Sequence, residues 1–580
     1  MFGFLTPFRS ESAGPLTDVV AAETFWRTLP HEDPIAAQMA VCETLAVPIT
    51  RGSPSLDRLR ALLALDERAR ILVDALLFND IAGGPQSPSL EMQSWQAAFE
   101  LCRSFGRVHT QFLRSMRDSP RFQGWREYLP FVVLRLFQQR QIELTLRPFV
   151  DERSTRFPWK ELHEVYRLAQ SRELLHDGLP VNRRYSASAL DTTPEREYIH
   201  VLLQALLNGG HFPPHDALWI SQNLPRWSEA LALKSHQGRS AKSRFVVDPD
   251  GDSGIARSNV DSPGPGLCLD TASFLASIRD EIASLRDVPG RPSEGSSLRP
   301  ARQLKLLRKL SDLCSPERQA IARRGEREPM ALTVEVAVGL PQILRTLRNK
   351  PEVPVAAAPR TAAASEGITI MGYGGSAEDS TDGNLGGEST ITQWSYPGVI
   401  VAHPPLTMVD HSDSGCRLHG PTLGTNPIMP GCLIAFRENV TTPWTLAVVR
   451  RVKKRLAGKR VEIGVEYLGR DPRWVIVTVV VPDSDTSPTR PPGSAPSRFA
   501  ALYLPQSAVH PVLLMKTLVL PARGLAPEDR LSVRSRTSVH TIQLKEPLDE
   551  QAEFIWSPFE ILDRWLKDEP TSVKATSAAG

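Results

Sequence analysis

Apolar residues recur every three or four positions through most of residues 17–350, the period of an amphipathic helix. Leu56, Leu59 and Leu63 fall on one helical face, and similar stripes follow along the chain. Between Phe131 and Phe149 apolar and basic residues interleave, which predicts a helix with a buried face and a basic solvent face. The spacing therefore predicts an all-α N-terminal half.

Capping signals support this assignment at one site in particular. Thr192 and Glu195 have the spacing of a capping box, with Pro194 in the first turn. The pair predicts a helix that continues to Leu206 and ends at Gly209-Gly210.

Two segments interrupt the helical pattern. Residues 239–265 are rich in Ser, Asp, Gly and Pro, which predicts a mobile loop between helices of the 17–350 domain. Residues 351–389 hold Ala, Pro, Gly and Ser with few large apolar residues, and we interpret them as a linker.

Beyond the linker the apolar period changes to two, the period of a β-strand. Residues 391–481 predict a small antiparallel β-barrel, and residues 498–567 predict a further β segment. Ser557 and Glu560 form a second capping-box pattern, which predicts a terminal helix. The predicted barrel strands are Val399–Val401, Cys432–Phe436, Thr445–Val449, Val461–Leu468 and Trp474–Val481.

Composition narrows the class of protein. The chain has 580 residues and a net charge of +3, and a prior of about 150 residues per domain predicts two to four domains. So small a charge gives no reason to expect a nucleic-acid polymer as partner. The six cysteines form no C-x-x-C pair, which argues against a zinc site and fits a reducing compartment. No run of about 18 apolar residues occurs, so we expect a cytoplasmic protein without membrane insertion.

The segment with the clearest chemistry is Asp410-x-Ser412-x-x-Gly415. Asp and Ser side chains can fold back on backbone amides to form a turn, and Gly allows a positive φ where the chain reverses. The same carboxylate can accept hydrogen bonds from the N–H donors of a guanine, while Gly permits its close approach. The pattern predicts a turn with binding capacity.

In its ordered context this segment resembles the PilZ domain family over roughly 90 residues, by the pattern D/N-x-S-x-x-G. The resemblance implies a small β-barrel that binds cyclic di-GMP through Asp410, Ser412 and Gly415. The elements that follow in matching order are the Pro430-Gly431 turn, the strand ending at Val449-Arg450, and the Gly464–Leu468 strand.

One element of that family pattern is not found where it is expected. Nucleotide-binding members carry R-x-x-x-R shortly before the turn, and these arginines hold phosphate and stack on guanine. Residues 361–409 contain neither Arg nor Lys, so Arg417 and Arg450 become the candidates for phosphate contact. The R-x-x-x-R spacing does occur elsewhere, which we interpret as chance, at Arg117/Arg121, Arg323/Arg327 and Arg530/Arg534.

The basic run Arg450–Arg455, with Lys459 and Arg460, leaves two interpretations open. It supplies substitute cations or meets an acidic partner, or it is a solvated hairpin whose lysines discourage edge-to-edge pairing. We favour the solvated hairpin.

We therefore expect a bacterial signalling adaptor whose barrel senses cyclic di-GMP and passes the signal through the helical half. The alternative is a degenerate scaffold that binds a protein partner and no nucleotide. We expect no enzyme and no cofactor. The one hydrolase-like segment, Gly251–Gly254, lies in the predicted loop without a positioned base, and Asp248-x-Asp250-x-Asp252 lacks the bidentate ligand of a calcium loop.

Overall fold

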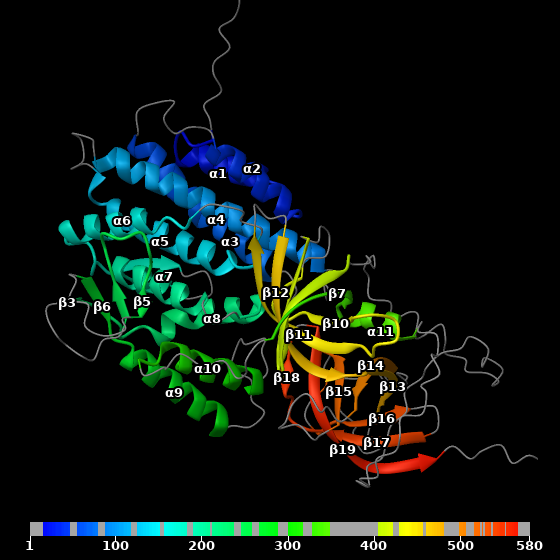
Figure 1. Cartoon of the computed structure of the whole chain (residues 1–580). Helices are drawn as coiled ribbons and strands as arrows, with labels where there is room; N and C mark the ends of the chain where they lie inside the picture. Colours follow the sequence, from blue (N-terminus) through cyan, green and yellow to red (C-terminus); the bar gives the residue numbers. More distant parts are fainter. Residues whose placement is uncertain are drawn as a thin grey trace, which may run out of the picture. The chain divides into compact units, whose positions relative to one another are not determined.

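The structure, a computed structural model, divides the chain into two compact units (Figure 1). We call Met1–Ile321 the helical unit and Ala322–Gly580 the barrel unit. Within the described residues, none of the helices is both long enough and apolar enough to cross a bilayer. The structure describes residues 15–46, 55–78, 88–117, 125–150, 156–182, 189–208, 212–236, 245–257, 266–287, 300–316, 328–348, 404–421, 428–455, 460–480, 498–505, 516–522, 525, 528–534, 538–551 and 553–566.

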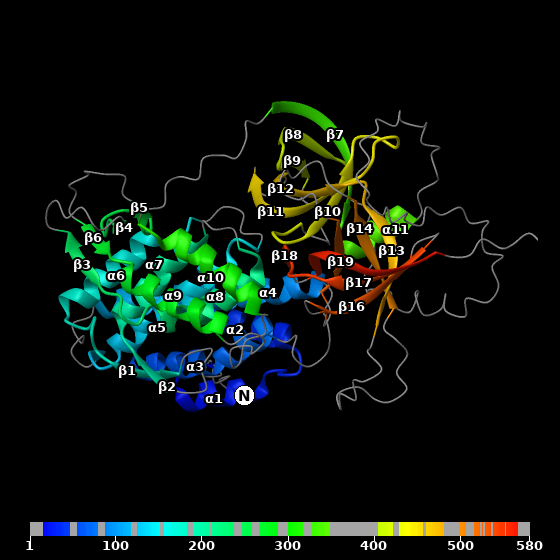
Figure 2. The ribbon, with the colours of Figure 1, turned by 90° about the horizontal axis from the view of Figure 1, so that it is seen from below.

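The predicted multidomain organisation, with a helical N-terminal half followed by a small antiparallel β-barrel and a further β segment, is confirmed. The described helices of the helical unit are α1 (Val19–Thr28), α2 (Pro34–Ala46), α3 (Leu56–Phe78), α4 (Pro88–Arg117), α5 (Leu129–Leu146), α6 (Trp159–Ser171), α7 (Pro194–Asn208), α8 (Pro214–Trp227), α9 (Ala272–Asp287) and α10 (Pro300–Cys314). Helix α3 contacts α1 and α4, and α5 contacts α4 and α7 (Figure 2).

Helix α5 is central to this unit and is buried on nearly every side. Its predicted basic solvent face is wrong, because Arg135 and Arg140 are buried and paired with carboxylates. Arg135 pairs with Glu67 of α3, and Arg140 pairs with Glu143 one turn along α5. Buried guanidinium groups are tolerated only with such partners. These two arginines therefore lie in the interior of the helical unit and not on a solvent face.

The helical unit also contains short strands, so it is not all-α. β1 (Leu179–Asn182) pairs with β2 (Ala189–Thr192). A four-stranded antiparallel sheet has the order β3-β6-β4-β5, with β3 (Leu233–His236), β4 (Phe245–Val247), β5 (Ala256–Arg257) and β6 (Gly266–Leu269). The predicted mobile loop 239–265 is thereby corrected, because its residues 245–257 form two strands and a docked turn.

That docked turn is held against α6 by polar and packing contacts. Asp250 pairs with Arg167, and His163 Nε2 lies 2.8 Å from the Ser253 carbonyl oxygen. A Cβ at Gly254 would lie 2.6 Å from the Trp159 ring, so only glycine fits there. Ser253 thus meets the imidazole through its backbone, as a structural contact.

His163 makes the stability of the helical unit pH-dependent. Its Nε2 donates to the carbonyl, so its Nδ1, 2.6 Å from the Tyr198 hydroxyl, accepts, and the ring is neutral. Burial lowers the pKa of this imidazole below its ordinary value. Below about pH 6.5 the unfolded chain binds more protons here, so the free energy of unfolding falls with falling pH, by up to about 1.4 kcal/mol per unit.

Urea titrations of the full chain at several pH values between 5 and 8, followed by circular dichroism, would measure this slope. In His163→Gln the contribution should be missing, whereas His176→Gln, on an exposed histidine, should retain it. An unchanged slope in His163→Gln would contradict the prediction.

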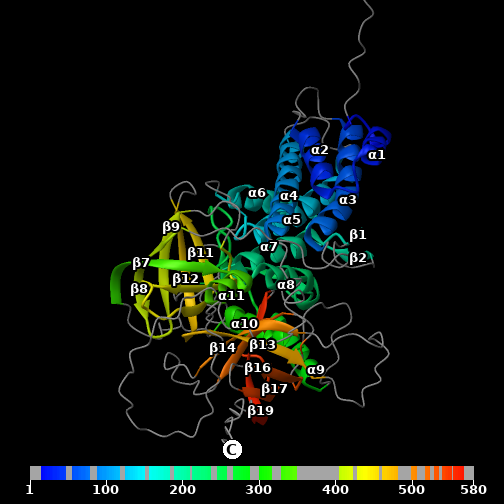
Figure 3. The ribbon, with the colours of Figure 1, turned by 90° about the vertical axis from the view of Figure 1, so that its right-hand side faces the viewer.

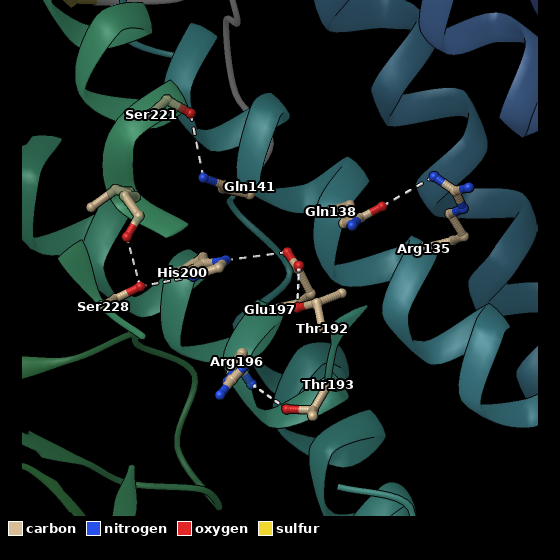
Figure 4. A network of polar contacts seen from close by, with 11 residues as sticks. Arg135, Gln138, Gln141, Thr192, Thr193, Arg196, Glu197, His200, Ser221 and Ser228 are labelled. Atoms are coloured by element: carbon tan, nitrogen blue, oxygen red, sulfur yellow. Dashed lines mark hydrogen bonds and ion pairs between the residues drawn. The ribbon is translucent and has the colours of Figure 1, made fainter. Parts of the chain in front are cut away.

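A buried polar network ties β2, α7 and the end of α8 together (Figure 4). Thr192 Oγ1 donates to Glu197 over 2.8 Å, and the other carboxylate oxygen lies 3.2 Å from His200 Nδ1. His200 Nε2 lies 2.9 Å from the hydroxyl of Ser228, the residue that caps α8. Because these groups are buried, mutual hydrogen bonds offset the cost of removing them from water.

The helix predicted after residue 192 is present as α7, but its N-cap differs by one residue. The side chain that accepts from a helical N–H is Thr193, which bonds the backbone amide of Arg196 at 3.3 Å. Thr192 remains in β2, and its hydroxyl is used by Glu197 instead. Because Thr192 and Thr193 are adjacent, residue spacing alone does not predict which of the two caps the helix.

The barrel unit begins with a closed antiparallel barrel, the first barrel, in the order β10-β11-β12-β9-β8-β7 (Figure 3). Its strands are β7 (Glu328–Val338), β8 (Leu406–Ser412), β9 (Gly415–Pro421), β10 (Leu433–Arg437), β11 (Thr445–Arg455) and β12 (Arg460–Arg470). Alternate apolar residues such as Val334, Leu418 and Ile463 form its core. β7 closes the ring by pairing with β8 and β10.

This closure corrects the predicted domain boundaries. β7 and α11 (Leu340–Arg348) belong to the barrel unit, although the sequence pattern assigned them to the helical domain 17–350. The predicted barrel 391–481 therefore lacks its first strand and includes β13 (Arg473–Val479), which pairs in another sheet. The predicted linker 351–389 lies outside the described residues.

A second sheet follows, in the order β15-β14-β13-β16-β17-β19-β18, and β15 also pairs with β19. Because that pairing closes the sheet on itself, we call it the second barrel. Its further strands are β14 (Arg498–Leu504), β15 (Thr517–Pro521), β16 (Arg530–Arg534), β17 (Ser538–Leu544), β18 (Asp549–Glu550) and β19 (Phe554–Leu566).

The terminal helix predicted within 498–567 is wrong, because its residues form β19. Phe554 and Trp556 pack into one core while Ile555 packs into another, which is the alternation of a strand. The Ser557 hydroxyl donates to the Lys545 carbonyl oxygen at 2.6 Å instead of capping a helix. Strand pairing with β15 and β17 overrides the local capping signal.

The two barrels share a hydrophobic core with α11. Trp444 and Leu446 of the first barrel pack in one cluster with Leu502 and Trp556 of the second and with Ile343 of α11. All five are buried, so the two barrels form a common body.

Candidate functional site at the β8–β9 turn

The predicted binding motif forms the two-residue turn between β8 and β9, where Ser412 is paired with Gly415. Ser412 Oγ donates to the Gly415 carbonyl oxygen over 3.1 Å and so fastens the turn. The expected positive φ at Gly415 is wrong, since the described glycines with positive φ are Gly339 and Gly431. Glycine is required for another reason: a Cβ there would lie 2.1 Å from the Val465 carbonyl oxygen of β12.

Next to the turn, Asp410 is held beneath Arg417. A register shift between Met408 and Asp410 brings the aspartate opposite Arg417 on β9, and the two side chains form an ion pair. Arg417 Nη1 also lies 3.7 Å from Glu462 of β12, and His419 Nε2 lies 3.6 Å from the same carboxylate. The Asp410 side chain is 5% exposed, whereas that of Arg417 is 37% exposed. One accessible arginine therefore covers a buried carboxylate.

Four of the predicted site residues therefore lie together at this turn: Asp410, Ser412, Gly415 and Arg417. The fifth, Arg450, instead forms ion pairs that connect the two barrels. Arg450 Nε lies 2.6 Å from Glu466 of β12, and its Nη2 lies 2.7 Å from Asp549 of β18. Burial lowers the pKa of this guanidinium, but the attraction of the Asp549 and Glu466 carboxylates outweighs it, and the pKa is raised. Glu466 is also paired with Gly415, so the link begins at the turn.

The basic run after Arg450 lies on the β11–β12 hairpin. Lys453 is exposed at the end of β11, and Arg460 is exposed at the start of β12. Residues 456–459, which include Lys459, lie outside the described residues. Both interpretations of this run stay predictions.

The position of β7 changes how the arginine spacing is interpreted. Arg323 and Arg327 themselves lie outside the described residues, but in the sequence Arg327 immediately precedes Glu328, the first residue of β7. Glu328 is paired with His411 and Pro329 with Asp410, so β7 starts beside the turn motif. The R-x-x-x-R spacing therefore ends one residue before the first strand of the barrel. From the sequence we interpreted this spacing as chance, because in the chain it does not stand shortly before the turn motif.

Elsewhere, Glu197, His200 and Ser228 follow the carboxylate–imidazole–hydroxyl order of a hydrolytic triad (Figure 4). Ser228 Oγ, however, donates to the Leu224 carbonyl oxygen at 2.7 Å and is 2% exposed. A nucleophile needs its proton directed to the base and access to a substrate. We therefore interpret this group as a structural network.

Comparison with known families finds a match in the helical unit. Residues 20–237, less than half of the chain, match the model described as the N-terminal domain of the cyclic-di-GMP receptor FimW. The match covers α1 to α8 and ends at the first strand of the four-stranded sheet. No curated protein and no solved structure matches the chain.

Proposed function

We propose that this protein is a cyclic di-GMP receptor of a bacterial signalling pathway, whose first barrel binds the nucleotide. Two independent observations support the proposal. The helical unit resembles the N-terminal domain of a cyclic di-GMP receptor family, and the first barrel carries the Asp410–Gly415 turn that resembles PilZ domains. A third observation carries it: β7 pairs with the turn motif, and in the sequence β7 directly follows the R-x-x-x-R spacing.

In this proposal each residue type has one chemical task. The Asp410 carboxylate accepts from the N–H donors of a guanine, and Ser412 and Gly415 hold the turn at close approach. Arg323 and Arg327 supply the counter-charge that the two phosphates need, because guanidinium groups bond phosphate bidentately. Arg450 keeps its structural link between the barrels. The helical unit then carries the signal to a protein partner in a cytoplasmic adaptor.

The alternative is a scaffold that binds a protein and no nucleotide. The observation that favours it is the engagement of Asp410 by Arg417, with Glu462 close by, which leaves an acid-rich cluster at the described part of the turn. An anionic dinucleotide would be repelled there unless further arginines take part.

Calorimetric titration of the full chain with cyclic di-GMP tests the proposal. We expect micromolar or tighter binding, and in Asp410→Ala a loss of about ten- to a hundredfold in affinity, because hydrogen bonds to a charged group contribute about 1.5–3 kcal/mol. Asp413→Ala is the matched control, since Asp413 is an exposed neighbour in the same turn. Absence of binding by the unmodified chain would favour the scaffold.

A further inference from the structure

The carboxylate that would recognise guanine is already occupied in the structure. Asp410 lies almost wholly out of solvent and its Oδ2 is ion-paired with Arg417 Nη2. Arg417 is over a third exposed, and its second carboxylate contact, with Glu462, is as long as 3.7 Å. Arg417 therefore lies between the Asp410 carboxylate and solvent. Of the two side chains, Arg417 is the exposed one, so it is the one that can turn away into water.

We propose that Arg417 is an internal competitor for Asp410 and sets the affinity of the site. This inference rests on the proposed function. A guanine edge can bond Asp410 only when the Arg417 guanidinium has moved away from it. Binding is then an exchange, in which neutral N–H donors of the base replace a cationic donor at the same carboxylate.

The balance of this exchange works against the ligand. A charge-assisted hydrogen bond in a poorly solvated site is stronger than one to a neutral donor, so breaking the Asp410–Arg417 pair opposes binding. The displaced arginine, being partly in water, regains only a screened interaction with the phosphates. Arg417 thus lowers affinity even though its charge is opposite to that of the nucleotide, contrary to its predicted role as a phosphate contact.

Removing the competing charge should therefore tighten binding. In Arg417→Gln the amide can still donate one neutral hydrogen bond to Asp410, which keeps the carboxylate partnered and the fold intact. We expect about a tenfold gain in affinity for cyclic di-GMP, a change equivalent to one weakened charge-assisted bond. Arg417→Lys keeps the charge without the guanidinium fork and should fall between the two.

The matched control is Arg437→Gln. Arg437 also makes a cross-strand ion pair in the same barrel, 2.7 Å from Glu335 of β7, but it lies on β10 and its carboxylate partner is exposed. Its replacement should leave the affinity unchanged.

Calorimetry on the full chain and its variants separates the possible failures. Tighter binding by Arg417→Gln, with Arg417→Lys intermediate and Arg437→Gln unchanged, is the expected result. Equal or weaker binding by both Arg417 variants, beside a binding unmodified chain, would overturn the competition and leave the proposed function standing. Absence of binding by every form would overturn both. If Arg417→Gln does not fold, the direction of change in Arg417→Lys decides alone.

Discussion

Replacement of both Arg323 and Arg327 by alanine is expected to weaken cyclic di-GMP binding by about a hundredfold to ten-thousandfold. The double substitution removes two guanidinium groups, and with each of them a charge-assisted interaction with the phosphates of about 1.5–3 kcal/mol. These two arginines end one residue before β7, whose first residues pair with His411 and Asp410. Calorimetric titration of the full-length double variant measures the effect directly.

The chain offers a matched control for this experiment. Arg530 and Arg534 have the same spacing and begin and end β16, a strand of the second barrel. Their double replacement changes the net charge by the same amount, so any effect of overall charge on affinity would appear in both variants. Similar losses in the two would show that the Arg323/Arg327 pair has no specific contact with the nucleotide.

The helical half and three of the six strands of the first barrel could be predicted because their signals are local. The stripe that begins Leu56, Leu59 is the 3.6-residue period of α3, and β10, β11 and β12 alternate within short runs bounded by turn residues. Such periods survive in the fold wherever a single face is buried.

What could not be predicted depends on pairing between distant segments. β7 ends at Val338 and its partner β8 begins at Leu406, so no turn signal joins them, and the alternation in β7 stood at the end of a helical region. β19 carried a capping pattern, but its pairing partners β15 and β17 decided its structure. Because the cost of closing a loop grows only slowly with its length, strands far apart in the chain can pair without any signal in the local sequence.

The candidate site shows the same division. Asp410, Ser412 and Gly415 were found from their spacing, and Arg417 because residues 361–409 contain no arginine or lysine; all four lie at one turn. The need for glycine at 415 arises from β12, and the partners of Arg450 lie on β12 and β18, so both required tertiary pairing to be known. Charge partners across strands have no fixed spacing in sequence.

Arg450→Met is expected to lower the free energy of unfolding of the barrel unit by about 2–4 kcal/mol. The Asp549 side chain is 3% exposed and pairs with Arg450 at 2.7 Å, so the substitution removes this counter-charge from a buried carboxylate. Breaking a buried pair by removing one partner costs about 3–5 kcal/mol. Gln551, which donates to Asp549 at 2.9 Å, and the partial exposure of Arg450 reduce that cost.

Chemical denaturation of Arg450→Met beside Arg473→Met would measure this difference. Arg473 pairs at 3.2 Å with Asp471 in a more exposed setting, where ion pairs contribute about 1 kcal/mol or less. The same variants distinguish two roles for Arg450. If it links the barrels, Arg450→Met loses stability but keeps its affinity for cyclic di-GMP under conditions where it is folded. If it contacts phosphate, affinity falls while stability is largely retained, and the structural assignment of Arg450 would have to be abandoned.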